Sequence, residues 1–586
     1  MTLMEERAPV DLSMHPRVRV LTDRCAGCQE CVIRCPVEAL SMDSERWVAV
    51  ADDTLCVGCR QCVRSCPFSA IEVEGPTLVT KRWRAETIRP TSILGNTTEV
   101  HPGFASSDEA IAEADRCLAC PDPTCVKGCP AHNDIPGMIS AIRNRDLVGA
   151  HEVLRRTSML PDICARICNW SNQCEGACTW SLAGAEPVAI GALERFVTDG
   201  QRVPGVERKS TEGEGLSVAI VGSGPAGIAA AWELLAQGAK VTMLEKDSEP
   251  LGVLRWGIPS FSLPDSVVNR PIEDLEAAGL ELVTNTEVGP ADIDELLGVH
   301  DAVVLANGAS VPLSLRFPGS DLEGVEDATS FLSRTKSALS DSEKLADVGM
   351  GTRVLVVGAG NTAMDVARTA RRFGAGEAPE GEGGTEAMDV ARTVRRFGGH
   401  VIAVDWMDRR FARVRPDELA EAEREGVDIR FLTSISKLEG VNGRVTKATL
   451  VKTRQRKRGD TPTILSGTAE TIDVDLVVAA MGYRNDSSFA DRVAPGTPWR
   501  AADHIDGPPD RRWMGSGVFA ASGNGIGNLS WTREIALRRA AYPFSAQVWV
   551  VGDALIGAST VVESMAQSKR AAQAILADAK RKALGP

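Results

Sequence analysis

The sequence predicts an α/β protein whose N-terminal region is rich in cysteine. An apolar strand-like stretch, a glycine-rich turn and a helix-like stretch follow one another twice, beginning near residues 217 and 353. This order is typical of a nucleotide-binding unit. All sixteen cysteines lie within the first 178 residues, in four tight groups. Thiolates clustered in this way usually hold metal, so a metal-containing region is expected to precede the α/β part.

The composition is that of a soluble globular protein with a sizeable core. The chain has 586 residues, of which 43% are hydrophobic and 25% charged, and this length predicts about four domains. A net charge of −14 argues against nucleic acid as a partner. No apolar run approaches the roughly 18 residues that cross a membrane, and the N-terminus lacks the apolar core of a secretory signal. The cysteines therefore indicate metal ligands in the reducing cytoplasm and not disulfides.

The first two cysteine groups have the spacing C-x2-C-x2-C-x3-C-P of bacterial ferredoxins with two 4Fe–4S clusters. A short strand-like piece follows each group, so residues 1–78 are expected to form a small α+β ferredoxin-like domain. In that pattern the fourth cysteine of each group binds the other cluster. The predicted ligands are Cys25, Cys28, Cys31 and Cys66 for one cluster, and Cys56, Cys59, Cys62 and Cys35 for the other. Zinc ribbons are the alternative, but they usually separate their two C-x2-C pairs by a dozen or more residues.

Two further cysteine groups lie among helix-like stretches of residues 79–210. Their spacings are C-x2-C-x4-C-x3-C from Cys117 and C-x3-C-x5-C-x3-C from Cys164. Taken alone, these spacings allow one self-contained metal site for each group.

The first nucleotide-binding unit runs from the strand SVAIV to an acid at the end of a second strand. Its three glycines permit a tight turn, the close approach of a pyrophosphate and close contact between helix and strand. Glu245 follows Gly222 by 23 residues, the position from which a carboxylate accepts a hydrogen bond from an adenosine ribose. The helix N-terminus would bind the phosphates. The turn residues are Gly222, Gly224, Pro225, Ala226 and Gly227.

The helix-like stretch of the second unit occurs twice. AMDVARTARRFG begins at Ala363 and AMDVARTVRRFG at Ala387, a period of 24 residues. From Gly358 to Asp405 is 47 residues, and removal of one period leaves 23, the interval found in the first unit. One copy is therefore expected to be an insertion. We expect the first copy to fill the helix position, because it joins the glycine turn directly, and residues 374–384 to form a surface loop. The turn residues are Gly358, Ala359, Gly360, Asn361 and Thr362.

Several motifs together resemble the small subunit of glutamate synthase over about residues 105–580. Dihydropyrimidine dehydrogenase carries a similar cysteine domain. The ferredoxin-like segment lies outside the resemblance. The motifs are EADRCLAC…PTCVKGCPAHNDIP, CEGACTW, EPVAIGALERF, LRWGIPSFSLP, NTEVG and VWVVGDALIGASTVVESMAQSKRAAQAIL.

The resemblance implies that the two later cysteine groups share their ligands. Cys164 is then left over, as a small buried side chain. A carboxylate is a harder ligand than a thiolate, so the cluster that it binds should have an unusual potential. The implied ligands are Cys117, Cys120, Cys125 and Cys178 for one cluster, and Cys129, Cys168, Cys174 and Glu194 for the other.

The resemblance also implies that FAD occupies the first unit, in a domain formed by residues 211–335 and 480–586, with an NAD(P)-binding domain at 336–479 nested inside it. The fold would then contain two nested Rossmann-like domains, a helical iron–sulfur domain and the ferredoxin-like domain. Gly552 and Asp553 would bind the flavin side chain, and the helix from about Ser559 would point at its ring. Other residues expected around the nucleotides are Leu254, Val288, Ala480, Gly482, Thr560 and Val561.

These features predict an NAD(P)H-dependent, FAD-containing iron–sulfur oxidoreductase. Hydride would pass to the flavin, whose electrons would enter four clusters singly and leave through the ferredoxin-like domain to a redox protein or a larger subunit of an oligomeric complex. No separate catalytic acid or base is expected, because the cofactors carry the chemistry. One alternative is an electron-transfer subunit of a larger complex, such as a 2-oxoacid or ferredoxin-linked one, that runs electrons toward NAD(P)+. Another is a non-catalytic redox scaffold, against which the intact GAGNTA turn argues.

Coenzyme choice depends on the end of the second strand of the NAD(P) unit. In the small-subunit family a tyrosine and two arginines usually stand there and bind the 2′-phosphate of NADPH. In this chain Asp405 stands there, and an acid accepts from a free ribose 2′-OH and repels a phosphate. Arg409, Arg410 and Arg413 follow and could bind that phosphate. We expect the acid to prevail and NADH to be preferred.

Overall fold

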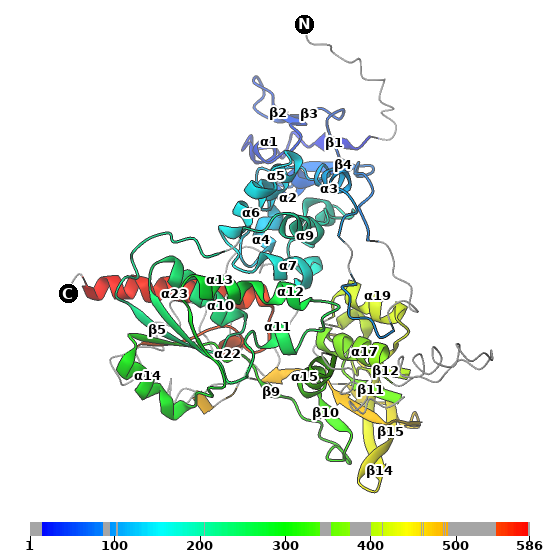
Figure 1. Cartoon of the computed structure of the whole chain (residues 1–586). Helices are drawn as coiled ribbons and strands as arrows, with labels where there is room; N and C mark the ends of the chain where they lie inside the picture. Colours follow the sequence, from blue (N-terminus) through cyan, green and yellow to red (C-terminus); the bar gives the residue numbers. More distant parts are fainter. Residues whose placement is uncertain are drawn as a thin grey trace, which may run out of the picture. The chain divides into compact units, whose positions relative to one another are not determined.

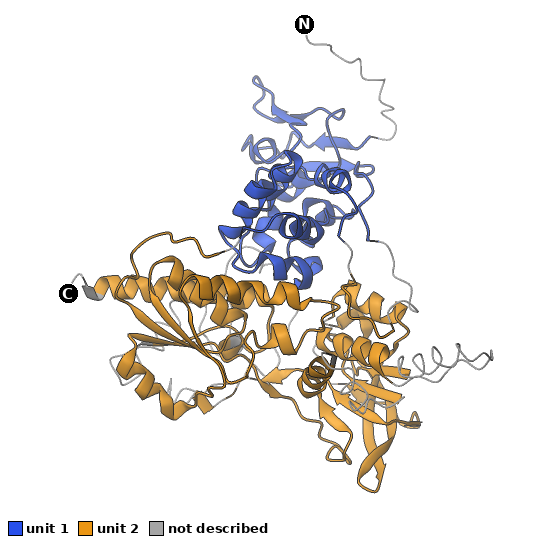
Figure 2. Ribbon diagram, viewed as in Figure 1, with its two compact units in different colours: residues 1–85, 102–203 blue, residues 86–101, 204–586 orange. Residues whose placement is uncertain are grey.

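The computed structural model falls into two compact units (Figure 2). The first comprises residues 1–85 and 102–203, and the second comprises residues 86–101 and 204–586. No helix among the described residues is long and apolar enough to cross a membrane. The structure describes residues 15–85, 94–100, 103–203, 205–339, 353–374, 400–412, 414–458, 460, 462–484, 486, 488–489 and 547–583.

The N-terminal part of the first unit, residues 15–85, is called here the ferredoxin-like segment. Strand β1 (Arg17–Val20) pairs antiparallel with β4 (Ile71–Glu74), and β2 (Leu40–Met42) with β3 (Ala49–Ala51). Short helices α1 (Glu30–Ile33) and α2 (Gln61–Ser65) begin inside the two cysteine groups. Leu40, Ala49 and Ile71 pack around the thiols of Cys31 and Cys62, so cysteine side chains form part of this small core.

Residues 103–203 of the first unit, the helical segment, contain short helices around a common apolar core. Polar side chains start several of them: Ser106, Asp134 and Asp146 each accept a hydrogen bond from a backbone N–H three residues later. The helices are α3 (Ser107–Ala114), α4 (Thr124–Gly128), α5 (Ile135–Arg143), α6 (Leu147–Arg155), α7 (Pro161–Ile167), α8 (Thr179–Leu182) and α9 (Ile190–Gly200).

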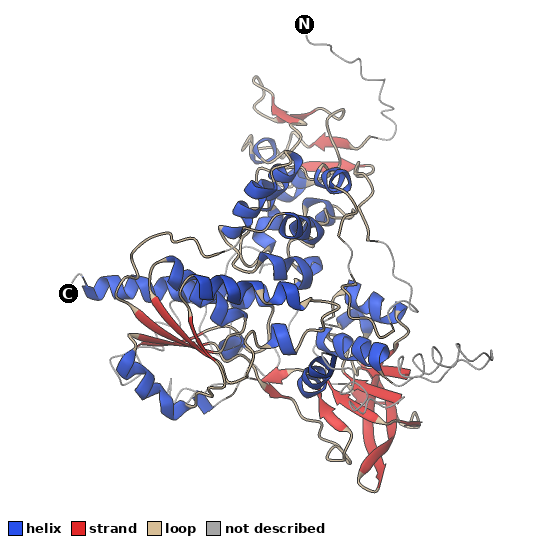
Figure 3. Cartoon of the chain, in the orientation of Figure 1, coloured by secondary structure: helices blue, strands red, loops and turns tan. Residues whose placement is uncertain are grey.

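The second unit contains a first α/β fold whose five strands are all parallel, in the order β20-β8-β5-β6-β7 (Figures 1 and 3). Its central strands β5 and β8 are apolar except for Ser217, because helices cover both faces. Helices α10 and α23 lie side by side on one face, and α14 packs on the other. The strands are β5 (Ser217–Val221), β6 (Lys240–Leu244), β7 (Glu281–Val283), β8 (Ala302–Leu305) and β20 (Gln547–Val550). The helices are α10 (Pro225–Ala236), α11 (Val253–Trp256), α12 (Asp265–Val268), α13 (Arg270–Ala277), α14 (Ile293–Val299), α22 (Asp553–Ile556) and α23 (Val561–Ala583).

The second α/β fold has a parallel sheet in the order β10-β18-β11-β12-β13. Helices pack on one face and an antiparallel layer packs on the other. Strand β10 precedes residue 336, so this fold begins earlier than the sequence predicts. The sheet strands are β10 (Val325–Asp327), β11 (Arg353–Val357), β12 (His400–Val404), β13 (Asp428–Arg430) and β18 (Leu476–Ala479). The helices are α15 (Ala328–Leu339), α17 (Asn361–Phe373) and α19 (Pro416–Arg424); the antiparallel layer holds β14 (Thr433–Val441), β15 (Arg444–Arg454), β16 (Thr463–Ile464) and β17 (Glu470–Asp473).

Two short strands join the two α/β folds. Strand β9 (Val311–Pro312) leaves the first fold and pairs antiparallel with β19 (Tyr483–Arg484), which returns toward it. The sequence predicts residues 86–101 in the helical region, whereas in the structure they belong to the second unit. The Val100 N–H donates to the Phe261 carbonyl at 2.9 Å, and the Gly95 N–H donates to the Arg372 carbonyl at 3.0 Å.

The first copy of the duplicated helix forms α17, directly after the glycine turn, as the sequence predicts. Its buried alanines and Val366 face β11 and β12. On its other side, Arg368 forms ion pairs with Glu418 at 2.7 Å and with Glu425 at 3.0 Å, both on or next to α19. The second copy, which begins at Ala387, lies outside the described residues.

One 24-residue copy should therefore be dispensable, and the two possible deletions form a matched pair. Deletion of residues 375–398 keeps the first copy, and deletion of residues 363–386 joins the second copy to the turn. The products differ only by alanine or valine at the position of Ala370, whose side chain is fully buried. We expect both variants to fold, and the valine form to be less stable by about 1–3 kcal/mol because of overpacking.

The free energy of unfolding from denaturant titration measures the difference. Failure of the variant that lacks residues 375–398 to fold would show that the second copy has a structural role.

Candidate cofactor sites

The glycine turn of the first fold is held by two close approaches. Gly222 has φ +98°, and a Cβ atom there would lie 2.6 Å from the carbonyl oxygen of Ala306. A Cβ atom on Gly227 would clash with the carbonyl oxygen of Gly222. Nothing lies within 4 Å of the Cβ position of Gly224. The first and third glycines are thus required by packing, whereas the second faces space that a pyrophosphate can enter.

A buried carboxylate is fixed beside this turn. Glu245 accepts hydrogen bonds from the N–H groups of Ser223 and Asp247, both at 3.0 Å, and from the Ser223 hydroxyl. The Ser223 hydroxyl in turn accepts from the N–H of Leu251 at 2.8 Å. This network holds Glu245 at the strand end next to the helix N-terminus, the place predicted for a ribose contact.

The C-terminal motif meets the same turn, although it lies far away in the sequence. A Cβ atom on Gly552 would lie 2.6 Å from the Cβ of Ala226 at the start of α10. Asp553 accepts hydrogen bonds from the Ser559 hydroxyl at 2.6 Å and the Ser564 hydroxyl at 2.9 Å. Burial raises the pKa of Asp553, and these hydrogen bonds lower it. The carboxylate is therefore held in place at the end of β20.

Helix α23 begins beside Asp553 with a reciprocal cap. The Thr560 N–H donates to the Glu563 carboxylate at 3.0 Å, and the Glu563 N–H donates to the Thr560 hydroxyl at 3.4 Å. Val561 is the first residue of the helix. Of the other residues predicted around the flavin, Leu254 is fully buried and Val288 packs on the core under the sheet.

The turn of the second fold repeats the geometry of the first. Gly358 has φ +126°, and a Cβ atom there would clash with the carbonyl oxygen of Ala480, just after β18. Nothing lies within 4 Å of the Cβ position of Gly360. Ala363 is fully buried where the first fold has its third glycine. The predicted Gly482 follows with φ +107°.

Asp405 occupies the position in the second fold that Glu245 occupies in the first. It accepts from the N–H groups of Ala359 at 2.9 Å and Met407 at 2.8 Å. Burial raises its pKa, and these two hydrogen bonds lower it. Asn361 accepts from the Arg415 N–H at 2.8 Å, which ties the loop after β12 to the start of α17.

The arginines that follow Asp405 are engaged with acids. Arg409 forms an ion pair with Glu423 at 2.6 Å, and Arg410 with Asp408 at 2.7 Å. Arg413 lies outside the described residues.

The cysteines of the ferredoxin-like segment approach one another in two mixed sets. The outer set, Cys25, Cys28, Cys31 and Cys66, lines a hollow at the surface of the segment. Burial, followed by the charges of Cys25, Cys28 and Cys66, raises the pKa of Cys31 to about 11. The inner set comprises Cys56, Cys59, Cys62 and Cys35. Burial, followed by the charges of Cys59, Cys56 and Cys35, raises the pKa of Cys62 to about 12. Each set thus contains three cysteines of one sequence group and the last cysteine of the other.

The helical segment contains a first helical set of thiols. This set comprises Cys117, Cys120, Cys125 and Cys178. Burial, followed by the charges of Cys178, Cys117 and Cys120, raises the pKa of Cys125 above its usual range. No three His, Cys, Asp or Glu side chains among the described residues are placed to hold a single metal ion. In a 4Fe–4S cluster each cysteine binds a different iron, so the ligands surround a space instead of meeting at one point.

A second helical set comprises Cys129, Cys168 and Cys174, with Glu194 beside them. A Cβ atom on Gly191 would clash with the ring of Trp170, so α9 lies close enough to bring Glu194 inside. The Glu194 Oε1 atom is buried and has no hydrogen-bond partner among the described residues. Burial, followed by Asp162, raises the pKa of this carboxyl to about 8. A buried carboxyl without a partner is costly, so its chemistry fits a metal ligand.

Three protein-family profiles match the chain. A 4Fe-4S dicluster domain matches residues 17–73, dihydropyrimidine dehydrogenase domain II (4Fe-4S cluster) matches 94–206, and pyridine nucleotide-disulphide oxidoreductase matches 216–506. The glutamate synthase [NADPH] small chain of Azospirillum brasilense is 32% identical over 511 residues, which are 83% of this chain and 92% of that protein. The protein of the same name from Escherichia coli (strain K12) is 33% identical over 402 residues, 66% of this chain and 79% of that one.

The chain belongs to the glutamate synthase small-chain family. It is therefore an oxidoreductase of the FAD and iron–sulfur type that the sequence predicts. The putative oxidoreductase AegA of E. coli (strain K12) is 28% identical over 585 residues, 94% of this chain and 80% of that protein.

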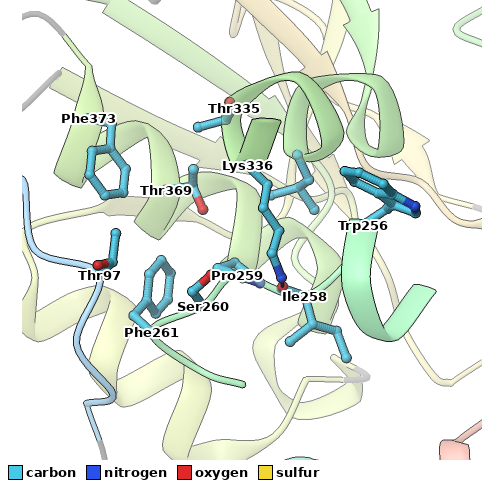
Figure 4. A pocket seen from close by; sticks show the side chains of 11 residues that line it. Thr97, Trp256, Ile258, Pro259, Ser260, Phe261, Thr335, Lys336, Thr369 and Phe373 are labelled. Atoms are coloured by element: carbon cyan, nitrogen blue, oxygen red, sulfur yellow. Dashed lines mark hydrogen bonds between the residues drawn. The ribbon is translucent and has the colours of Figure 1, made fainter. Parts of the chain in front are cut away.

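Neither glycine turn of this small-chain homologue lines the hollow shown in Figure 4. It lies where the first fold meets α15 and α17, and Lys336 lies between Trp256 and Phe261 in this view. Lys336 forms an ion pair with Asp265 at 2.9 Å. The Phe261 ring lies 4.0 Å from the Arg372 guanidinium. These contacts join the two α/β folds, so the hollow is a feature of their seam.

Two contributions to the cofactor sites were not predicted from the sequence. Ser223 holds Glu245, and the carbonyl of Ala306 forms one wall of the first turn. A sequence signal for the second exists: Ala-x-Gly follows an apolar strand in both folds, at residues 306–308 and 480–482.

Two alanine substitutions separate packing from ligand approach in the first turn. Gly227→Ala should destabilise the flavin-free protein by about 1–3 kcal/mol, because its Cβ would overpack against the turn. Gly224→Ala should leave this stability unchanged and lower the retention of FAD, because only a ligand meets the new methyl group. Thermal unfolding and flavin content after gel filtration measure the two effects. Equal destabilisation by both variants would contradict this division of roles.

Proposed function

We propose that this chain oxidises NADH and passes the electrons through FAD and four 4Fe–4S clusters to a protein acceptor. The carrying observation is the repetition of one geometry: in both folds a buried carboxylate accepts from the N–H after the first glycine of the turn. Bound FAD would exchange electron pairs with a nicotinamide and single electrons with a cluster, chemistry that no side chain supplies. The residues of the chain bind and orient these groups.

The assignment of the clusters follows the proximity of the thiols. We assign one cluster to each of the outer, inner and first helical sets, and a fourth to Cys129, Cys168, Cys174 and Glu194. Support comes from the hollow that the outer set lines. In the other sets, the thiols lie close enough for the charge of each to raise the pKa of its neighbours. The unpartnered Oε1 atom of Glu194 supports its place as the fourth ligand.

Iron content and EPR test this assignment. Anaerobically purified protein should contain about sixteen irons, because each cluster contains four. Glu194→Ala should alter the EPR spectrum of one cluster and leave the other three unchanged. Cys164→Ser is the matched control in the same site and should retain all the iron. A content near half the expected iron, or an unchanged spectrum of Glu194→Ala, would contradict the assignment.

The preference for NADH rests on Asp405. Its carboxylate has the same backbone partners as Glu245, and it would meet the 2′-phosphate of NADPH in a buried position. Two like charges in contact cost several kcal/mol where water is scarce. The ion pairs of Arg409 and Arg410 with neighbouring acids leave less positive charge for a phosphate.

Anaerobic addition of NADH should bleach the bound flavin and reduce the clusters. We expect kcat/KM for NADH to exceed that for NADPH at least tenfold, or about 1.4 kcal/mol. Asp405→Asn keeps the shape of the side chain and removes its charge, so it should narrow this ratio. A tenfold preference for NADPH would show that the arginines read the ribose instead. An absence of bleaching by either coenzyme would favour a non-catalytic scaffold.

The ferredoxin-like segment is the proposed port to the partner. Cys28 of the outer set is exposed. Phe68, which is 47% exposed, lines the hollow of this set. Trp47, which is 57% exposed, lies against Gly27, another residue that lines it. Relatives are named as a small chain of glutamate synthase and as the subunit PreT of NAD-dependent dihydropyrimidine dehydrogenase. We infer that a larger subunit or redox protein binds here, and purification from native expression would identify it.

A further inference from the structure

Within the first unit, the ferredoxin-like and helical segments meet through their cysteine loops. Cys59 of the inner set is only 7% exposed and belongs to the same buried cluster as Cys178 of the first helical set. Cys117 and Cys125, also of the first helical set, pack against this cluster. Val57 and Val79 pack on this cluster as well. The inner set and the first helical set are therefore neighbours.

An ion pair spans this junction and joins the two ligand loops themselves. Arg34 directly precedes Cys35 of the inner set, and Asp122 lies between Cys120 and Cys125 of the first helical set. The guanidinium of Arg34 binds the carboxylate of Asp122, 88 residues further along the chain. The side chains of the pair are 34% and 25% exposed, so both are partly shielded from water.

The pair is the centre of a line of alternating charges. Arg34 also forms an ion pair with Glu30, at 2.7 Å, on its own helix. Asp122 also pairs with Lys127 on the side of the helical segment. Each segment thus supplies one acid and one base, and only the Arg34–Asp122 contact crosses between the segments within this line.

We propose that the Arg34–Asp122 ion pair is the positioning contact that sets the spacing of the inner set and the first helical set, and that electrons cross between the two segments there. The inference deepens the proposed function and rests on it. In this electron transfer, the cluster of one set is oxidised by one electron and the cluster of the other set is reduced by the same electron. No covalent bond is formed or broken, and no proton is transferred. The rate of such a transfer falls steeply with distance, so a contact between the ligand loops controls it directly.

The contribution of the Arg34–Asp122 ion pair to the free energy of unfolding is too small to be its main role. Partly exposed ion pairs contribute little to stability. Reversal of one partner is a stronger perturbation, because like charges in contact repel each other. Asp122→Lys would bring two positive side chains, Arg34 and Lys127, against a third and should open the junction.

The test uses the full chain with its clusters in place. Asp122→Lys is compared with Glu72→Lys, a reversal opposite Arg19 on the exposed β1–β4 pair, which is a matched control away from the junction. EPR of the dithionite-reduced protein reports the spin–spin interaction between neighbouring clusters, and needs neither nicotinamide nor flavin. Rapid-freeze EPR after mixing with NADH reports the arrival of electrons at the ferredoxin-like segment.

We expect Asp122→Lys to lose the spin–spin interaction between the cluster of the inner set and the cluster of the first helical set. The arrival of electrons at the ferredoxin-like segment should slow at least tenfold, or about 1.4 kcal/mol, while the rate of flavin bleaching stays the same. Glu72→Lys should change neither. Arg34→Gln, Asp122→Asn and their double variant should show equal, smaller effects, because either change removes the same contact. If Asp122→Lys loses iron, the Asn variant carries the test.

An unchanged interaction and arrival rate in an iron-replete variant would overturn the proposal. Failure of the proposed function is distinguishable, because NADH would then not bleach the parent protein, whereas the dithionite experiment would still report the contact.

Discussion

Each nucleotide turn depends on one constraint: the backbone passes so close to a neighbouring strand end that no side chain fits between them. Once the chain turns there, the next N–H points at a buried carboxylate and the helix N-terminus is left open for an anion. The position of the carboxylate and the open space above the second glycine both follow from that approach. The pairs concerned are Gly222 with Ala306 and Gly358 with Ala480.

The first unit depends on a different balance. Its small cores contain thiols, and burial raises the pKa of Cys31 to about 11 and of Cys62 to about 12. Metals bind the thiolate, so cluster binding must supply the free energy that burial removes, and folding and metal binding are coupled. In the proposed electron path, the contact between the ligand loops then sets the spacing of the sites and adds little to the stability of the unit.

The two α/β folds are joined by buried charge and an aromatic ring. Arg372 lies over Phe261 of the first fold, donates to the Asn96 carbonyl at 3.0 Å and pairs with Glu425 at 2.7 Å. Buried charges are tolerated only when they are paired, so the acids near α19 select a helix with arginines at these positions. Both copies of the duplicated helix keep those arginines, at residues 368 and 372 and at 392 and 396. Either copy therefore carries the arginines that the seam needs, and both the direct link to the turn and the smaller side chain of the buried Ala370 favour the first.

The features that could be predicted from the sequence are local along the chain: the glycine turns, the acid that follows each turn and the cysteine spacings. These depend on backbone geometry and ligand distance within a few dozen residues, which leave a pattern in the sequence. The contacts between distant groups appear only in the fold: Arg34 meets Asp122, Gly552 meets Ala226, and Glu194 is buried. The tertiary structure also assigned residues 86–101 and strand β10 to the second unit and the second fold. Such contacts arise from the packing of whole elements, and an isolated arginine or aspartate carries no periodic signal of its partner.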